Sequence, residues 1–150
     1  MNLRNYRSKL SILFFLIGSL AAFGQAQKKT KKINIRHSDK GYYSKAEGKQ
    51  RLIGNVVFEH EGAIMNCDSA WLYSVENRIK AFRSVKINQG DTLLLWGDHL
   101  EYSGETRQAV VTGEEVKLQD SEMTLTTDRL RLDRNTNIAY YTTGGRVVNE

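Results

Sequence analysis

Three aspartates recur at a fixed interval, and their type and spacing could serve chemistry. Asp68, Asp98 and Asp128 each lie 30 residues from the next. A column of carboxylates could ligate calcium, and a pair could hydrolyse a glycoside. Calcium needs several oxygens converging within about 2.3–2.6 Å. One aspartate per repeat, without a second carboxylate at a fixed offset, does not supply them, so the spacing predicts no metal site.

A structural role explains the same aspartates better. In the stretch "LLLWGDHLEY", Leu93 and Leu95 share one parity, whereas Leu100 and Tyr102 share the other, and Asp98 lies at the change. An extra residue, as in a β-bulge, inverts the facing of a strand and bends it. An aspartate there can accept a backbone N–H and tolerates unusual backbone angles. We therefore interpret the three aspartates as a stacked column of corner residues.

The other residues suited to catalysis form no recognisable site. His37, His60 and His99 share no position in the repeat, and no HExxH pair occurs. The acids at 114–115 and 59–61 fall in expected turns or on outward faces, although a glycosidase pair stays an open alternative. We expect no catalytic residue, no metal and no cofactor.

The two tryptophans do not fit the inward parity of their strands. Trp71 and Trp96 alternate with the residues that we place inside. Either they form an outer contact surface, or the parity is wrong at one of them, and the sequence leaves both alternatives open.

The aspartates belong to a longer repeat. A small residue precedes each one, and apolar residues stand three positions before it and two and four positions after it. Within segments the period is two, β-branched and aromatic residues are frequent, and proline is absent from the chain. This pattern predicts an all-β domain of stacked antiparallel strands in repeats of about 30 residues, with a shared apolar interior. The inward positions are Met65, Leu72, Val85, Ile87, Leu95, Leu100, Val116, Leu118, Leu125, Leu130 and Leu132.

The beginning of the chain predicts export. Residues 1–26 combine a basic start with a short apolar run that ends in small residues, as in a secretory signal peptide; an uncleaved amino-terminal anchor is the alternative. The expected division is a signal peptide at 1–26, a basic linker at 27–47 and a β domain at 48–150. Cys67 is the only cysteine, so we expect a buried small residue; a disulfide between chains is the alternative.

The net charge of +5 does not indicate nucleic-acid binding. Three basic residues lie in the leader and four lysines lie in "KKTKK" at 28–32, so 15 basic residues face 17 acidic ones from residue 33 onward. The lysine run is typical of a solvated linker, with contact to anionic lipid as the minority alternative.

Taken in order, three segments resemble the OstA-like family of organic-solvent-tolerance and periplasmic lipopolysaccharide-transport proteins. They are "GNVVFEHEGAIMNCDSAWLY", "VKINQGDTLLLWGDHLEY" and "GEEVKLQDSEMTLTTDRLRLD", and the resemblance covers about residues 48–148. It implies a β-jellyroll that is open at its ends and apolar inside. It also implies transport of lipopolysaccharide toward the outer membrane from the periplasm, with acyl chains in the groove and related domains docked end to end by strand pairing. The stretch "GRVVNE" at 145–150 begins a fourth repeat, which we expect to be cut short.

Two other functions stay open at this point. The same inward residues would make the filled core of a structural or adhesive β-repeat protein at the cell surface. A carbohydrate-active β-solenoid enzyme is the third hypothesis, and it needs a cluster of acids on one exposed face.

Overall fold

The computed structural model describes residues 31–90 and 92–149. The described residues form strands, turns and bends without a helix, which confirms the prediction of an all-β fold. The strands are β1 (Asn34–His37), β2 (Lys40–Ser44), β3 (Lys49–His60), β4 (Ala63–Tyr73), β5 (Arg78–Asn88), β6 (Leu94–Ser103), β7 (Gln108–Gln119), β8 (Met123–Asp133), β9 (Ile138–Tyr140) and β10 (Gly145–Asn149).

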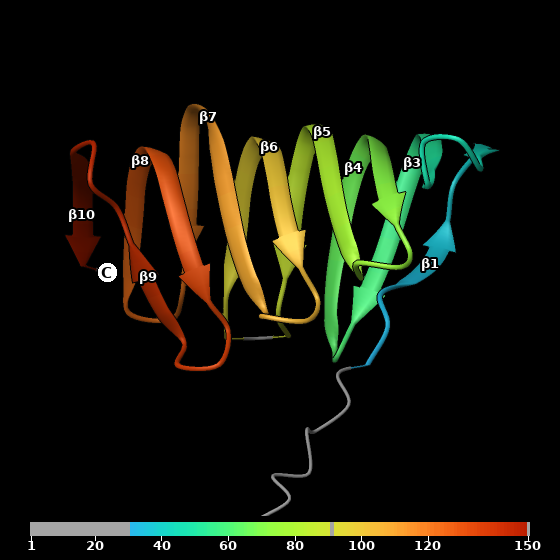
Figure 1. Cartoon of the computed structure of the whole chain (residues 1–150). Helices are drawn as coiled ribbons and strands as arrows, with labels where there is room; N and C mark the ends of the chain where they lie inside the picture. Colours follow the sequence, from blue (N-terminus) through green and yellow to red (C-terminus); the bar gives the residue numbers. More distant parts are fainter. Residues whose placement is uncertain (1–30, 91, 150) are drawn as a thin grey trace, which may run out of the picture.

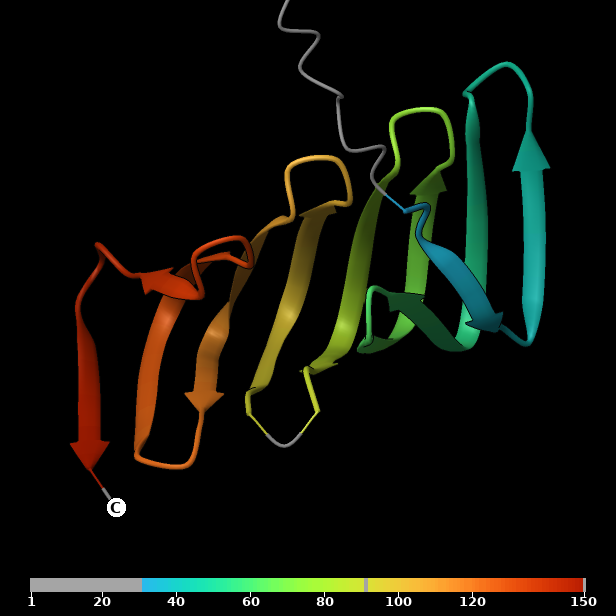
Figure 2. The same ribbon diagram turned by 90° about the horizontal axis from the view of Figure 1, so that it is seen from below.

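The strands follow one another across the molecule almost in sequence order. The hydrogen-bonded path is β1-β3-β4-β5-β6-β7-β8-β10, all antiparallel, while β2 pairs with β3 and β9 pairs with β8. Figures 1 and 2 show this succession from β1 and β2 at one end to β10 at the other.

Strands β3 to β8 each bend in the middle and so contribute to two facing layers (Figure 1). We call layer 1 the halves that pair in line with β1 and β10, and layer 2 the halves that pair in line with β2 and β9. Inward side chains from both layers meet between them, as in a sandwich with interdigitating inner faces.

The bends coincide with shifts of strand register at the repeated aspartates. Asp68 of β4 lies opposite Gly54 and Asn55 of β3, because Ile53 pairs with Ser69 and Val56 with Cys67. Gly54 and Asn55 both have positive φ, at 80° and 45°. The residues in excess therefore lie on the strand that faces the aspartate, and they form a bulge that bends the pair of strands.

The next corner repeats this geometry. Asp98 of β6 faces Arg83 and Ser84, whose φ values are 63° and 50°, and its Oδ2 accepts the backbone N–H of Glu114 at 3.1 Å. Asp128 lies opposite residues 113–115 and accepts the hydroxyl of Thr143.

The repeat begins one unit earlier than the sequence suggested. Asp39, between β1 and β2, lies 29 residues before Asp68 and occupies the same kind of corner. Its backbone N–H donates to Gly54 O at 2.9 Å, and its Oδ2 accepts from Asn55 Nδ2 at 2.9 Å. Strands β1 and β2 are thus one long strand interrupted at its corner. Strands β1 and β2 fall within the segment 27–47 that we expected to be a linker. They belong to the sheet because each of the two strands pairs with one half of β3.

The interior between the layers is filled with apolar side chains. Phe58, Leu95 and Val111 are fully buried, and Tyr102 and Leu52 are 2% exposed. Together with their neighbours they form one cluster of buried residues that extends from β3 to β8. No fully buried carboxylate, lysine or arginine interrupts this cluster within the part of the chain that the structure describes.

Candidate functional site

All eleven inward residues that the sequence indicated lie in this interior. Each is at most 6% exposed, and the paired residues Leu95 and Leu118 are followed on the next strand by Leu125. Beyond the corner, Leu100, Val111 and Leu130 repeat the arrangement in layer 2. The structure therefore brings together Met65, Leu72, Val85, Ile87, Leu95, Leu100, Val116, Leu118, Leu125, Leu130 and Leu132 as the walls of one apolar space.

Further wall residues continue the same alternation. Leu52, Ile79 and Val111 are 0–2% exposed. Ile79 pairs with Leu72 and Val111 pairs with Leu130, both predicted inward residues, while Leu52 pairs with the buried Ala70. Strand parity on both sides of each corner is the signal that identifies them.

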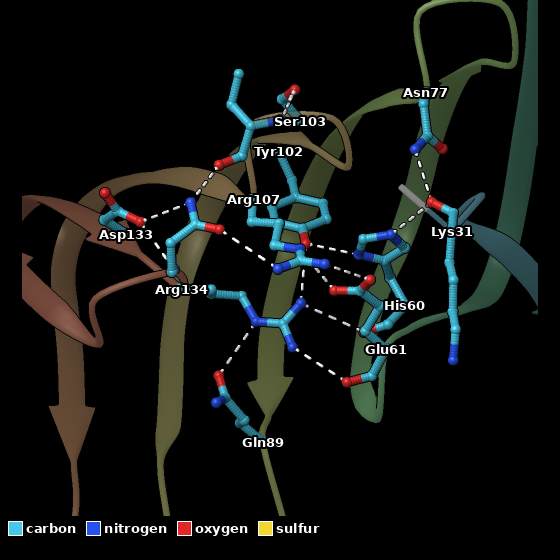
Figure 3. Close-up of polar contacts among 12 residues, drawn as sticks. Lys31, His60, Glu61, Asn77, Gln89, Tyr102, Ser103, Arg107, Asp133 and Arg134 are labelled. Atoms are coloured by element: carbon cyan, nitrogen blue, oxygen red, sulfur yellow. Dashed lines mark hydrogen bonds and ion pairs between the residues drawn. The ribbon is translucent and has the colours of Figure 1, made fainter. Parts of the chain in front are cut away.

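Opposite the corners, the two layers meet along a line that we call the mouth. Its first lip consists of the turns that follow β3, β5 and β7, and its second lip consists of the turns that follow β4, β6 and β8. Glu61 and Gln89 of the first lip contact Arg107 and Arg134 of the second lip (Figure 3). With His60 and Tyr102 just inside, these side chains make up the polar cluster of the mouth.

Arg134 holds the lips together through neutral oxygens. Its Nη1 donates to Tyr102 Oη at 2.8 Å and to the His60 carbonyl at 3.3 Å. Its Nη2 donates to the Glu61 carbonyl at 3.3 Å, and its Nε donates to Gln89 Oε1 at 3.2 Å. One side chain of the second lip thus contacts two turns of the first lip and the interior tyrosine.

The second cross-mouth contact is an ion pair. Arg107 Nη2 donates to Glu61 Oε1 at 2.8 Å, and Arg107 Nε lies 2.7 Å from Glu61 Oε2. The Nε contact is close enough for electrostatic attraction but lacks hydrogen-bond geometry, so we treat it as an ion pair only. Both side chains are largely covered, at 26% and 20% exposure, and solvent therefore screens this pair less than a surface pair.

His60 links the cluster to the start of the fold. The residue is fully buried; its Nδ1 lies 2.7 Å from Tyr102 Oη, and its Nε2 lies 2.8 Å from the Lys31 carbonyl. Because a carbonyl only accepts, we assign the proton to Nε2, and Nδ1 then accepts the hydroxyl of Tyr102. Burial raises the pKa of Tyr102, against the opposing charge of Arg134, so the hydroxyl keeps the proton that it donates.

Asn77 fastens the entering chain across the second lip. Its Nδ2 donates to the Lys31 carbonyl at 2.9 Å, and its Oδ1 accepts the backbone N–H of Ile33 at 2.8 Å. The Ile33 side chain is 7% exposed and belongs to the interior cluster. The segment directly before β1 therefore covers part of the mouth (Figure 3).

Sequence analysis did not identify the polar cluster. One recurrence in the sequence points to the second-lip turns: their last residues, Asn77, Arg107 and Asn137, lie 30 residues apart, and the structure gives each of them a positive φ. The partners across the mouth stand up to 74 residues away, as Arg134 does from His60.

Both tryptophans lie on outer faces and are half-buried. Trp71, in layer 2, packs edge to face on Phe82 with ring centroids 4.9 Å apart, under the Lys49 ammonium at 4.1 Å. Trp96, in layer 1, lies between Lys86 and Lys117, whose ammonium groups are 5.8 and 5.3 Å from its ring. The parity that placed them outside was therefore correct at both residues.

Neither a metal centre nor a helical membrane span occurs in residues 31–90 and 92–149. No group of three or more His, Cys, Asp or Glu side chains is placed to hold a metal ion, and no helix long and apolar enough to cross a membrane is present there. The predicted signal peptide lies outside the described residues.

Comparisons with known proteins identify what the chain is similar to. The model of a family described as OstA-like protein matches residues 29–150. Among solved structures, the chain is similar to LptH from Pseudomonas aeruginosa, described as the LptA homologous periplasmic component of the conserved lipopolysaccharide transport device. The two share 12% sequence identity with a TM-score of 0.68 over 79% of this chain and 94% of that chain, which shows a common fold, the expected jellyroll. No curated protein matches the sequence.

Proposed function

Because the chain belongs to the OstA-like family, we propose that it is a periplasmic module of lipopolysaccharide transport which holds the acyl chains of the lipid between its two layers. The proposal draws on the likeness to LptH, a periplasmic component of such a device. Proteins of this kind are transport bridges and not enzymes, which agrees with our interpretation of the repeated aspartates as corner residues.

The observation that carries the proposal is the uninterrupted apolar interior. Each methylene of an acyl chain gains about 0.8 kcal/mol when it leaves water for such a space, and no specific polar contact is needed. The walls are mostly leucine, isoleucine and valine, and both layers contribute to them.

Lipid entry requires the layers to separate, because the interior is filled by its own side chains. The corners are continuous backbone, whereas the mouth is joined by side-chain contacts of the polar cluster. We therefore propose that the layers part at the mouth and pivot at the corners, so that acyl chains lie inside and the polar part of the lipid stays outside.

The two ends of the molecule are suited to docking with other domains of this type. Ile35 pairs with the inward Phe58 yet is 37% exposed, and Val147 pairs with the inward Leu125 yet is 46% exposed. Strands β2 and β10 each have a neighbour on one side only, within the residues described. Pairing of such edges with a related domain would cover both the apolar ends and the unpaired backbone groups.

A photo-crosslinking experiment tests the proposed function. A photoreactive amino acid at Leu95 or Leu125 should capture lipopolysaccharide, whereas the same amino acid at the exposed Glu115 or at the exposed Lys86 on the outer face of layer 1 should capture little. Capture at the two surface positions alone, in variants with unchanged circular dichroism, contradicts the proposal.

A structural protein with a filled core is the second candidate, and one observation favours it. The wall residues are buried by the protein's own side chains. This candidate predicts that neither interior position captures lipid under conditions in which the fold stays intact.

A further inference from the structure

The outer face of layer 2 is basic, although the folded part of the chain is not. Two neighbouring cross-strand rows run over this face, one from Lys40 to Arg129 and the other from Tyr42 to Tyr140. Acidic residues are concentrated in corners and turns instead. Across both rows the charged residues other than histidine are the basic Lys40, Arg51, Lys80, Arg129 and Arg131 and the acidic Glu101.

Among the described residues, only Arg51 and Lys80 of these five form ion pairs, while Lys40, Arg129 and Arg131 form none. Lys80 forms an ion pair with Glu101 at 2.8 Å, and this hydrogen bond is the main reason that the pKa of Glu101 is lowered. Arg129 and Arg131 make no side-chain hydrogen bond or ion pair with any described residue. They point from the same face of β8, two residues apart, so their Cα atoms are about 7 Å apart.

The two arginines lie where two surface hollows join. One open hollow, of about 580 Å³, extends from Trp71 and Phe82 across His99. The other, of about 570 Å³, extends to Tyr140 and Thr142, and both hollows are lined by Val110, Arg129 and Arg131. The face therefore offers an elongated depression with Arg129 and Arg131 at its centre; its other charged residues are Lys80, Glu101 and Asp133.

The surroundings of the arginines favour a charged sugar chain over other anionic partners. An extended peptide could not pair as a strand here, since the backbone of β3 to β8 in layer 2 is already hydrogen-bonded on both sides. A membrane surface calls for protruding aromatic anchors; the rows offer Tyr42 and Tyr140 at their two ends, whereas Trp71 and Phe82 in the depression are half-buried. Hydroxyl and amide groups of Thr112, Thr142 and Gln108 line it instead, and they suit the hydroxyls of a saccharide.

We propose that this depression binds an anionic oligosaccharide, with Arg129 and Arg131 contacting its phosphate or carboxylate groups and the flanking polar and aromatic side chains contacting its sugar rings. Guanidinium groups bind such anions with two parallel hydrogen bonds. The inference rests on the proposed function in one respect: the saccharide is assigned to the polar part of the same transported lipid.

Binding of a lipid-free probe tests this site separately from the interior. The probe is the phosphorylated oligosaccharide that remains when all acyl chains are removed from lipopolysaccharide, and calorimetry at low and moderate salt measures its affinity for the exported chain. We expect the double variant R129Q/R131Q to bind at least tenfold more weakly than the unchanged protein. The matched control is K86Q/K117Q, which removes two positive charges beside Trp96 on the outer face of layer 1 and should change the affinity less than twofold.

Several other outcomes would contradict the proposed saccharide site. Equal loss in the two double variants means nonspecific charge attraction, and no saturable binding at millimolar probe means no site. Tighter binding to anionic phospholipid vesicles or to a polyglutamate peptide than to the oligosaccharide means a different partner. Crosslinking at Leu95 separates the two proposals, because its failure with intact probe binding rejects only the lipid interior, and the reverse result rejects only this depression.

Discussion

Replacing Arg134 by methionine should destabilise the protein through the mouth alone. The variant keeps a long side chain but removes the donors to Tyr102, Gln89 and two carbonyls. The 2.8 Å bond to Tyr102 involves a charged donor and should contribute about 1.5–3 kcal/mol, while the three longer contacts add little, because water replaces them once the lips open. We expect the free energy of unfolding to fall by about 1.5–3 kcal/mol, a sizeable part of the roughly 5–15 kcal/mol typical of a domain.

Urea denaturation of R134M measures this loss, and R131M is its matched control. Arg131 lies near the end of β8, three residues before Arg134, and its side chain is exposed on the outer face. Its replacement should therefore change the free energy of unfolding by no more than about 0.5 kcal/mol. Amide hydrogen exchange should accelerate in the turns after β3 and β8 of R134M and stay unchanged at the corners. Equal stability of R134M and R131M would refute the view that the polar cluster joins the layers.

Three further predictions concern the mouth, the interior and a corner. E61Q leaves Arg107 without its charged partner in a largely covered position and should lower the free energy of unfolding by about 1–3 kcal/mol in urea titrations, with E105Q as exposed control. Burial raises the pKa of the Cys67 thiol to about 12, so the folded protein retains a proton that the unfolded chain loses above about pH 9. The free energy of unfolding should therefore decline between about pH 9 and 12, and it should decline less in C67A. Alkylation of Cys67 at about pH 8 should require urea. G97A places a methyl group into the Val111 side chain and 3.3 Å from the Thr112 carbonyl, and should cost about 1–3 kcal/mol in thermal unfolding.

Strand parity was sufficient to predict the fold class and the interior. The change of parity around Asp98 places Leu95 and Leu100 on the same side of a bent strand, and both are buried. The tryptophans followed the same rule to the outer faces. Alternation works here because each strand has one buried face, so that a residue on the wrong face would bury a charge or expose a leucine.

Two features could not be obtained from the pattern. Asp39 was not recognised as part of the repeat because its flanking stretch "IRHSDKGYY" has few apolar positions. Strands β1 and β2 lie at the exposed end of the sheet, so their side chains are mostly exposed. The polar cluster escaped because it joins turns that no alternation relates. Gln89 and Arg134 are 45 residues apart, and only the bend of every intervening strand brings them together.

The separation of these partners along the chain also sets an order of folding. Each strand from β3 to β8 pairs with its sequence neighbours through short turns, so successive hairpins form with little loop-closure entropy. Contacts of the polar cluster that span 73 and 74 residues can form only after the layers have bent toward each other. We therefore expect the last folding intermediate to be a complete sheet in which the contacts of the polar cluster have not yet formed. In that intermediate the leucine-rich walls are accessible from the mouth. An apolar molecule could enter the space between the layers before the polar cluster closes it.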